Sequence, residues 1–350
     1  MGSGKPTIDD VAALAGVARV TVSRVLNGGP NVSDKVRQAV LAAVEKLQYK
    51  VNMQARSLAG GRSRVLGLIY SSDVENEPNS FYIAGIELGA LRACGQVGFQ
   101  LGTHAVNQHS LRKADTVMEL IRSRRYDGLI LTPPFSDDTD LLEKIKAARF
   151  PVVALSAGRP AQQIISSVCI DDEAASFELT RYLLSLGHKS FAFIKGLEGH
   201  ISAEDRYAGF VRALEMAGID PKTARVERGG FTFRSGTDIA TKILNSPDRP
   251  SALVCANDDM AVGALFAAHK MGFNLPRDLS VVGFDDTPVS EIIWPPLTTI
   301  HQPLKTMGAR AAEILFDMVG GEPSPVPDGS LVTLVSHRLV IRESATTPAG

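Results

Sequence analysis

Residues 19–27, with the sequence RVTVSRVLN, carry the clearest chemical signal in this 350-residue chain. Helical periodicity would turn Val22, Val25 and Leu26 to one side, where they could pack against other helices. The opposite side then presents hydrogen-bond donors beside an exposed valine: Arg19, Val20, Ser23, Arg24 and Asn27. Such a cluster of donors on one helix face suits the major groove of DNA, where base edges carry acceptors.

Two flanking helices would position that stretch. Thr7 begins an apolar-periodic run and is followed three residues later by Asp10, an approximate capping box, and Gly16 would end this first helix. A third helix is predicted from about 33 to about Tyr49, with apolar residues at helical spacing. This pattern predicts a helix-turn-helix whose second helix reads base edges. Periodicity alone leaves a generic three-helix bundle open as the alternative.

Charge is distributed unevenly along the chain. Residues 1–64 hold ten Lys and Arg against four Asp and Glu, a net +6, while the remaining 286 residues hold 27 against 34, a net −7. A basic head on an acidic body is typical of a polyanion-binding module attached to a second functional unit. A solvated surface would also explain so small a positive charge, so the charge supports the helical pattern and does not replace it.

From Val65 onward the chain alternates short apolar runs with helical stretches. Predicted strands are 65–70, 99–103, 128–132, 152–155, 191–194, 253–256 and 280–283, and predicted helices include 83–92, 114–124, 174–186, 207–216 and 260–271. This order predicts parallel sheets covered by helices, and the length allows two such lobes. A ligand would bind between the lobes, at the carboxyl ends of the strands.

Polar side chains follow two of these strands. Asn257 and Asp258 come directly after 253–256, and Asp285 follows 280–283. Their amide and carboxylate groups can bond the hydroxyls of a sugar. The alternative for each is structural, because Asn257 and Asp258 could cap a helix and Asp285 could belong to a turn.

Several functional classes are disfavoured. The sequence has no G-x-G-x-x-G after a strand and no G-x-S-x-G, and its seven His form no ligand-spaced pair, so we expect no enzyme, cofactor or metal. The three cysteines lie in apolar contexts and are predicted to be buried. We expect a cytoplasmic protein, because no run is long and apolar enough to span a membrane and no secretory signal is visible. A periplasmic sugar carrier would share the body but has no use for residues 5–60.

The chain resembles the lactose-repressor family of bacterial transcriptional regulators. The resemblance rests on residues 7–63, which begin TIDDVAALAGVARVTVSRVLNGG, and on three later stretches, CANDDMAVGAL, LSVVGFDD and PPLTTIHQP, and it runs from about Pro6 to about Glu343. It implies an α/β protein, with a small all-α helix-turn-helix domain followed by a two-lobed periplasmic-binding-protein-like body with parallel sheets. The implied function is repression of transcription from a near-palindromic operator under the control of a small-molecule effector.

The resemblance assigns roles within the head. Arg19 and Val20 match the positions that choose operator bases, since Arg can bond guanine bidentately and Val can contact a thymine methyl. Other matched positions would contact phosphates or base edges: Thr7, Thr21, Ser23, Arg24, Asn27 and Asn31. Residues 52–61 resemble the family's hinge helix, in which Asn52 and Ala55 would face the minor groove and Leu58 would enter a base step as a wedge.

The resemblance also implies an effector site. Arg206 matches a position that bonds ligand oxygens, at the start of a helix, and Phe231 matches an aromatic position that stacks on a sugar ring. Asn257 and Asp285 are the other candidates in the same lobe. Weaker candidates on the other side are Ser71, Phe81, Tyr82 and Trp294, together with Ser156, which stands where some sugar-responsive relatives carry Asp. The expected effector is a mono- or disaccharide or glycoside acting as inducer, and a purine or other metabolite acting as corepressor is the alternative.

Domain limits follow from the same resemblance. We expect a head over 1–51, a hinge over 52–61, a body over 62–343 and a flexible tail over 344–350. Within the body, the first lobe would comprise 62–169 and 302–331, and the second 170–300 and 332–343. A homodimer is expected, with helix 83–92 and the loop 107–114 at its interface. The tail lacks the leucine heptads that would make a tetramer.

Overall fold

A computed structural model describes residues 6–26, 29, 32–49, 63–71, 80–320 and 330–349. The chain divides into two compact units, Met1–Ser63 and Arg64–Gly350. Each unit has its own hydrophobic core, and each is therefore described by itself.

The first unit contains three helices, α1 (Ile8–Ala15), α2 (Arg19–Leu26) and α3 (Asp34–Lys46). Thr7 and Asp10 form the predicted capping box at the start of α1, and Gly16 ends that helix with φ +67°, a conformation that glycine adopts without strain. Val11, Val22 and Val40, one from each helix, are fully buried together. The predicted helix-turn-helix is therefore present.

The first lobe of the body is built on a six-stranded parallel sheet in the order β11-β5-β4-β3-β1-β2. Its strands are β1 (Val65–Ser71), β2 (Gln100–Val106), β3 (Gly128–Leu131), β4 (Val152–Leu155), β5 (Ser167–Cys169) and β11 (Val332–Leu334). Along β3, Ile130 packs into one core and its neighbours Leu129 and Leu131 into another, so both faces of the sheet are covered.

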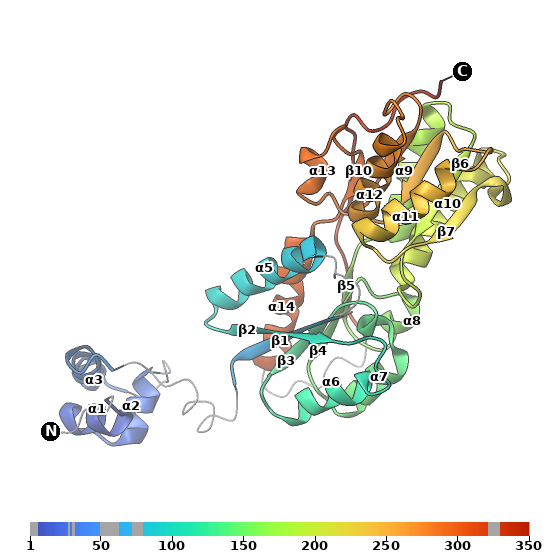
Figure 1. The fold of residues 1–350 in the computed structure, drawn as a ribbon. Coiled ribbons are helices and arrows are strands. Elements are labelled where there is room, and N and C mark those ends of the chain that lie inside the picture. Colours follow the sequence, from blue (N-terminus) through green and yellow to red (C-terminus); the bar gives the residue numbers. More distant parts are fainter. Residues whose placement is uncertain are drawn as a thin grey trace. The chain divides into compact units, whose positions relative to one another are not determined.

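Helices cover the two faces of this sheet (Figure 1). Helices α5 (Ser80–Gln96) and α14 (Leu304–Gly320) pack against each other and contribute Ile86 and Ala311 to the core shared with Ile130. Helices α6 (Lys113–Arg122) and α7 (Thr139–Ala147) contribute Val117 and Leu141 to the opposite core. Two short segments, η1 (Phe135–Asp137) and α8 (Arg159–Gln162), follow the carboxyl ends of β3 and β4.

The second lobe has a four-stranded parallel sheet in the order β7-β6-β8-β9. The strands are β6 (Phe191–Lys195), β7 (Arg225–Arg228), β8 (Ala252–Cys255) and β9 (Ser280–Val282), and the helices are α9 (Asp172–Ser185), α10 (Ile201–Met216), α11 (Phe233–Leu244), α12 (Asp258–Lys270) and α13 (Val289–Ile292), with η2 at Pro221–Thr223. The connections run outward in opposite directions from β6 and β8, so the topological switch point lies between these two strands. Parallel α/β sheets bind ligands at such a point.

The chain passes between the lobes three times. It leaves the first lobe after β5, returns after β10 (Thr299–His301), and leaves again after β11 for β12 (Arg338–Val340), which pairs antiparallel with β10. The predicted lobe limit at 331/332 is too early, because Val332–Leu334 still pairs with β5 of the first lobe.

Two further expectations are wrong. Helix α10 begins at Ile201 and not at Tyr207, so Arg206 lies in its second turn; acidic Glu204 in the first turn suits a helix N-terminus.

The C-terminal segment is also no free tail, at least as far as Thr346. Ser344 is fully buried, its carbonyl accepts a hydrogen bond from Val281 N at 2.9 Å, and Thr346 N donates to Ser280 Oγ at 3.0 Å. The Ser344 bond occupies a backbone donor on the edge of β9.

All three cysteines, Cys94, Cys169 and Cys255, are free and buried, as predicted. Among the described residues, no helix is long and apolar enough to cross a membrane. Within the same part of the chain, no group of three or more His, Cys, Asp or Glu is placed to hold a metal ion.

Candidate functional site

Helix α2 presents a mixed polar and apolar face to solvent. Arg19, Val20 and Arg24 are exposed, Val20 to 63%, whereas Val22 and Val25 are buried in the head core. Thr21 and Ser23 are half-buried at the border between the two sides. An exposed valine between two arginines gives the face both an apolar contact for a thymine methyl and donors for guanine or phosphate.

Arg19 and Thr7, two of the predicted DNA contacts, each bond a side chain of α1. Arg19 Nη1 lies 3.4 Å from Asp9 Oδ2 in an exposed ion pair, which contributes little to stability but holds the guanidinium near α1. Thr7 Oγ1 accepts a hydrogen bond from Asp10 N at 3.3 Å and donates to Asp10 Oδ2 at 2.7 Å. A hydrogen bond from the Thr7 backbone and, second, the hydroxyl bond lower the pKa of Asp10. The remaining predicted DNA contacts, Asn27, Asn31, Asn52, Ala55 and Leu58, lie outside the described residues, as does the whole predicted hinge.

In the body, Arg206 is the centre of a buried polar cluster. Its side chain comes from α10, is 4% exposed as a residue, and packs over the Phe284 ring with 3.8 Å between the guanidinium carbon and the ring centroid. Nε donates to Asp172 Oδ1 at 2.8 Å and Nη1 donates to the Ala256 carbonyl at 2.6 Å. Nη1 also lies 3.8 Å from Asp285 Oδ1. Burial disfavours its charge, but the two carboxylates more than offset this and raise the pKa of Arg206.

Asp285 faces Arg206 from the segment that follows β9. It is 3% exposed and has a φ of +114°, and its Oδ1 accepts a hydrogen bond from Gln302 Nε2 at 2.6 Å. Burial raises the pKa of Asp285 to about 7, because desolvation outweighs the favourable charge of Arg206 and the hydrogen bond from Gln302. The strained backbone and the perturbed carboxyl together are typical of a functional position.

Asn257 serves as a helix cap, which was the structural alternative, and also as an anchor. Its Oδ1 accepts from Met260 N at 3.0 Å, and its Nδ2 donates to the Phe231 carbonyl at 3.1 Å. Phe231 has a φ of +59°, and its ring lies so close to Gly196 that a Cβ there would come within 1.9 Å of Cζ. Asn257 and Gly196 therefore fix the aromatic ring beside the carboxyl end of β6.

Asp258 has a structural role. It is fully buried, and its carboxylate accepts from Thr299 Oγ1 at 2.6 Å, from Thr287 N at 2.7 Å and from Thr287 Oγ1 at 3.0 Å. Burial raises its pKa well above the ordinary value, with a further contribution from Asp285. These bonds tie α12 to the segment after β9 and to β10, so they hold Asp285 in place.

The first lobe contributes a pair of hydroxyls. Tyr82 Oη and Ser156 Oγ lie 2.9 Å apart, and Ser156 is buried with a φ of +50°. Burial is the largest cause of a raised pKa at Tyr82, and the carboxylates of Asp285 and Asp172 raise it further while Arg206 lowers it. Charges of the second lobe therefore act on a hydroxyl of the first.

Not every predicted residue joins this cluster. Ser71 ends β1 at the carboxyl edge of its sheet and is half-buried, and Phe81 is exposed at the start of α5. Trp294 is 71% exposed, so its indole is not buried in the cluster.

Sequence reasoning missed three residues that contact Arg206, Asp285 or Phe231. Asp172 is the closest ionic partner of Arg206, Gln302 holds Asp285, and His200 packs its ring 5.3 Å from the Phe231 ring. Burial and the charge of Arg206 lower the pKa of His200 to about 4, so the imidazole is neutral at pH 7. Gln302 stands in the PPLTTIHQP stretch that carried the resemblance, but Asp172 had no local signal.

Asp137 joins the two lobes directly. Its Oδ1 accepts from Gly158 N at 2.8 Å within the first lobe, and its Oδ2 accepts from Ile201 N at 3.1 Å at the start of α10. Burial raises the pKa of Asp137 to about 6 despite these two bonds. Gly158 is required here, because a Cβ would lie 2.3 Å from Ile201 Cγ2. The lobes thus meet at the helix that carries Arg206.

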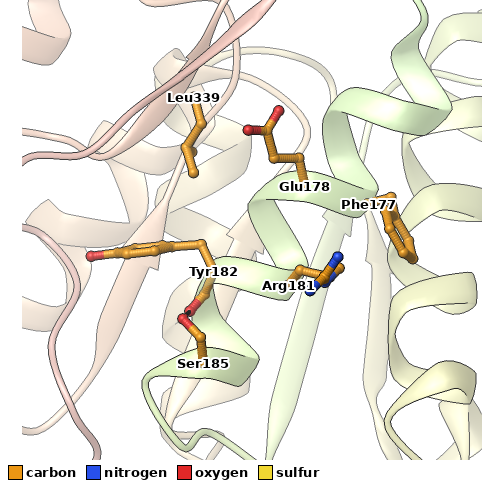
Figure 2. Close-up of a pocket in the computed structure, with 6 residues that line it drawn as sticks. All are labelled: Phe177, Glu178, Arg181, Tyr182, Ser185 and Leu339. Carbon is orange, nitrogen blue, oxygen red and sulfur yellow. Dashed lines mark hydrogen bonds between the residues drawn. The ribbon is translucent and has the colours of Figure 1, made fainter.

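A groove of about 380 Å³ lies elsewhere, beside α9 (Figure 2). It is lined by Leu339 of β12 and by five α9 residues: Phe177, Glu178, Arg181, Tyr182 and Ser185. Glu178 pairs with His337 at 3.3 Å, and Ser185 Oγ donates to the Tyr182 carbonyl at 2.7 Å. None of the predicted site residues lines this groove.

Two protein families match the chain. Residues 7–52 match the bacterial regulatory proteins of the lacI family, and residues 180–345 match a periplasmic binding protein-like domain. Catabolite control protein A of Priestia megaterium is 33% identical over 97% of this chain and 98% of its own length. The HTH-type transcriptional regulator CelR of Thermobifida fusca is also 33% identical, over the same shares of the two chains.

Solved structures agree with these matches. The Lac repressor dimer bound to operator and the anti-inducer ONPF has a TM-score of 0.82 at 31% identity, covering 98% of this chain and 100% of that one. A complex of the transcriptional regulator CelR with cellobiose has a TM-score of 0.71 at 32% identity, covering 97% and 99%. Because full-length relatives match both the three-helix head and the two-lobed body, this chain belongs to the lacI family of bacterial regulatory proteins, which are DNA-binding transcriptional regulators.

Proposed function

We propose that this protein represses transcription as a homodimer on a near-palindromic operator and that a small sugar or glycoside, bound between its lobes, induces release from DNA. The observation that carries the proposal is the pairing of an exposed recognition face on α2 with a buried Arg206–Asp172–Asp285 cluster in the body. The first can read bases, and the second has the polar groups that orient a hydroxyl-bearing ligand.

On DNA, Arg19 and Val20 select bases and Arg24 contacts phosphate. Thr7, Thr21 and Ser23 assist from the border of the same face, and the predicted contacts of residues 27–58 complete the interface. A single head buries too little surface for specific binding, so two heads on paired half-sites are needed. The Lac repressor relative is a dimer bound to operator, which supports this assembly.

The dimer interface is proposed on the body. Leu91 of α5, Val97 and Leu111 are large apolar side chains that are exposed in the single chain, and they lie in or beside the predicted interface segments. A second exposed apolar pair in the second lobe, Phe233 and Phe266, packs with the rings tilted and 5.4 Å between their centroids. Covering such residues would stabilise association.

In the cleft, Arg206, Asp285 and Asn257 orient ligand hydroxyls and Phe231 packs on the apolar face of the sugar ring. Tyr82 and Ser156 contact the ligand from the first lobe, with Ser71 and Phe81 at its entrance. Gln302 and His200 belong to the same set, because Gln302 Oε1 and His200 Nε2 are buried without a hydrogen-bond partner in the described part of the chain. The relative CelR was solved with cellobiose, which supports a sugar over other metabolites.

Control of DNA binding by the ligand requires that the ligand prefer one arrangement of the lobes. The bonds of Asp137 to both lobes make that arrangement depend on the position of α10, which also carries Arg206. A ligand that moves Arg206 therefore acts on the lobe contact. The protein would act in the cytoplasm, where bacterial DNA is found, and would catalyse no reaction.

Selection of genomic fragments tests this function. The full chain is incubated with fragmented bacterial DNA at moderate salt, with and without a panel of neutral sugars. We expect enrichment of a near-palindromic sequence that one sugar abolishes. Equal binding of genomic and random duplex, with or without sugars, would refute the proposal.

A further inference from the structure

The charge balance of the cleft limits what it can bind. Arg206 is held by Asp172 at 2.8 Å and has Asp285 at 3.8 Å, so two carboxylates surround one cation. The same three charges act on Tyr82 of the first lobe. His200, the neighbouring imidazole, is neutral at pH 7. The positive charge of Arg206 is therefore already compensated before any ligand enters.

One hydrogen-bonding group of this site is a buried acceptor without a partner. Gln302 is 2% exposed, and its amide Nε2 donates to Asp285 Oδ1 at 2.6 Å. That orientation leaves Gln302 Oε1 as a buried acceptor with no partner among the residues described. A buried carbonyl without a partner is costly, so a ligand that donates to it gains that energy.

Both the buried acceptor Gln302 Oε1 and the two carboxylates around Arg206 would disfavour an anionic group of a ligand. Its phosphate or carboxylate oxygens are acceptors and could not satisfy Gln302 Oε1. Desolvating such a group needs an uncompensated cation, whereas the carboxylates of Asp172 and Asp285 would repel it.

We infer that the effector donates hydrogen bonds through hydroxyls and carries no anionic group, so that the cleft rejects the phosphorylated and uronic acid forms of the sugar it accepts. This inference rests on the proposed function and narrows it. Gln302 Oε1 and the Asp172–Arg206–Asp285 arrangement are the elements that discriminate.

Matched sugars test the inference with the full chain. Neutral hexoses and disaccharides, and the 6-phosphate and 6-uronate of each hexose, are titrated against protein bound to its selected operator fragment, with release followed by fluorescence anisotropy. We expect at least one neutral sugar to release the operator and its anionic congeners to act at least 100-fold more weakly. Release by a phosphate or uronate at a concentration equal to or below that of its neutral parent would overturn the inference while leaving the proposed function in place.

Single substitutions identify the residues that cause the preference for neutral sugars. Asp285→Asn keeps the acceptor for Gln302 but removes a charge, so the preference for the neutral sugar over its anionic congener should fall about tenfold. Gln302→Leu removes the buried acceptor and should weaken the neutral sugar about tenfold. Glu173→Gln, beside Asp172 but paired with Arg212 outside the cleft, should leave the preference unchanged. If Asp285→Asn leaves the preference unchanged, the charge argument is wrong; if no sugar of either kind releases the operator, the proposed function fails as well.

Discussion

The two functional regions of this protein differ in what their polar residues contact. On α2, Arg19, Val20 and Arg24 face solvent, and the ion pair of Arg19 with Asp9 is exposed. In the body, Arg206, Asp172 and Asp285 are almost fully buried, and Arg206 forms ion pairs with both aspartates. Residues of the first kind can change with little effect on folding, so operator specificity can vary independently of stability. Residues of the second kind stabilise the lobe that they serve, so ligand specificity and stability are coupled.

The largest effect is expected from Arg206→Ala. It leaves Asp172 buried without its cation, which should lower the free energy of unfolding by about 3–5 kcal/mol and abolish the response to the effector. Arg212→Ala is the matched control, because it lies on the same helix and pairs with Glu173, the neighbour of Asp172, at a half-exposed site. It should cost about 1 kcal/mol or less. Urea unfolding of both variants measures the difference. Equal losses of stability would contradict the expected difference between the buried and the half-exposed ion pair.

On the head, Arg19→Ala should act on binding alone. Loss of a base contact should weaken operator binding by about 1–3 kcal/mol, while stability changes by less than about 0.5 kcal/mol because the side chain is exposed. Fluorescence anisotropy measures the first quantity and thermal unfolding the second. Asp9→Ala breaks the same ion pair without removing the guanidinium, and it should retain most of the operator affinity. A large stability loss in Arg19→Ala would contradict the independence of this region.

Thr7→Ala tests a head residue that caps α1 and that we propose also contacts DNA. The substitution removes the hydroxyl that caps α1, so the head should lose about 1 kcal/mol of stability. Thr7→Ser restores the cap and should restore stability. Hydrogen exchange of α1 amides follows the head separately from the body, and unchanged protection in Thr7→Ala would refute the capping contribution.

A further expected effect concerns the pH dependence of the free energy of unfolding. The pKa of Asp285 is raised to about 7 in the folded state, above the value near 4 of an unfolded chain. Between these values the folded state binds more protons, so stability falls as pH rises from about 4 to 7. Asp137 and Asp205, with pKa values raised to about 6, contribute to the same window. Asp285→Asn should lessen the fall; an identical pH profile would contradict the assignment.

Sequence reasoning succeeded where the determining interactions are local. The capping box of Thr7 and Asp10 and the buried stripe of α2 follow from residues within one or two helical turns. Strand positions such as 152–155 follow from short apolar runs between turn residues, and β4 has those bounds. The cap formed by Asn257 was one of two alternatives, and the sequence could not show that its amide also holds Phe231, 26 positions away.

The remaining features depend on contacts between distant segments. Asp172 meets Arg206 over 34 positions and Asp285 meets Gln302 over 17, and neither spacing has a local signature. Residues 344–346 were predicted to be part of a flexible tail, but their partners lie in distant segments: β9, Thr298 and His188. The early start of α10 brought Arg206 one turn further into the helix, which lets its side chain reach the Ala256 carbonyl after β8.

The most direct test of the account is the effect of a ligand on operator affinity in wild-type protein and in Asp285→Ala. We predict that the sugar that releases wild-type protein from its selected operator leaves Asp285→Ala bound, while both proteins bind the operator equally without sugar. Thermal unfolding would confirm that the variant is folded. Release of Asp285→Ala at the same sugar concentration as wild type would show that this cleft does not control the DNA-binding head.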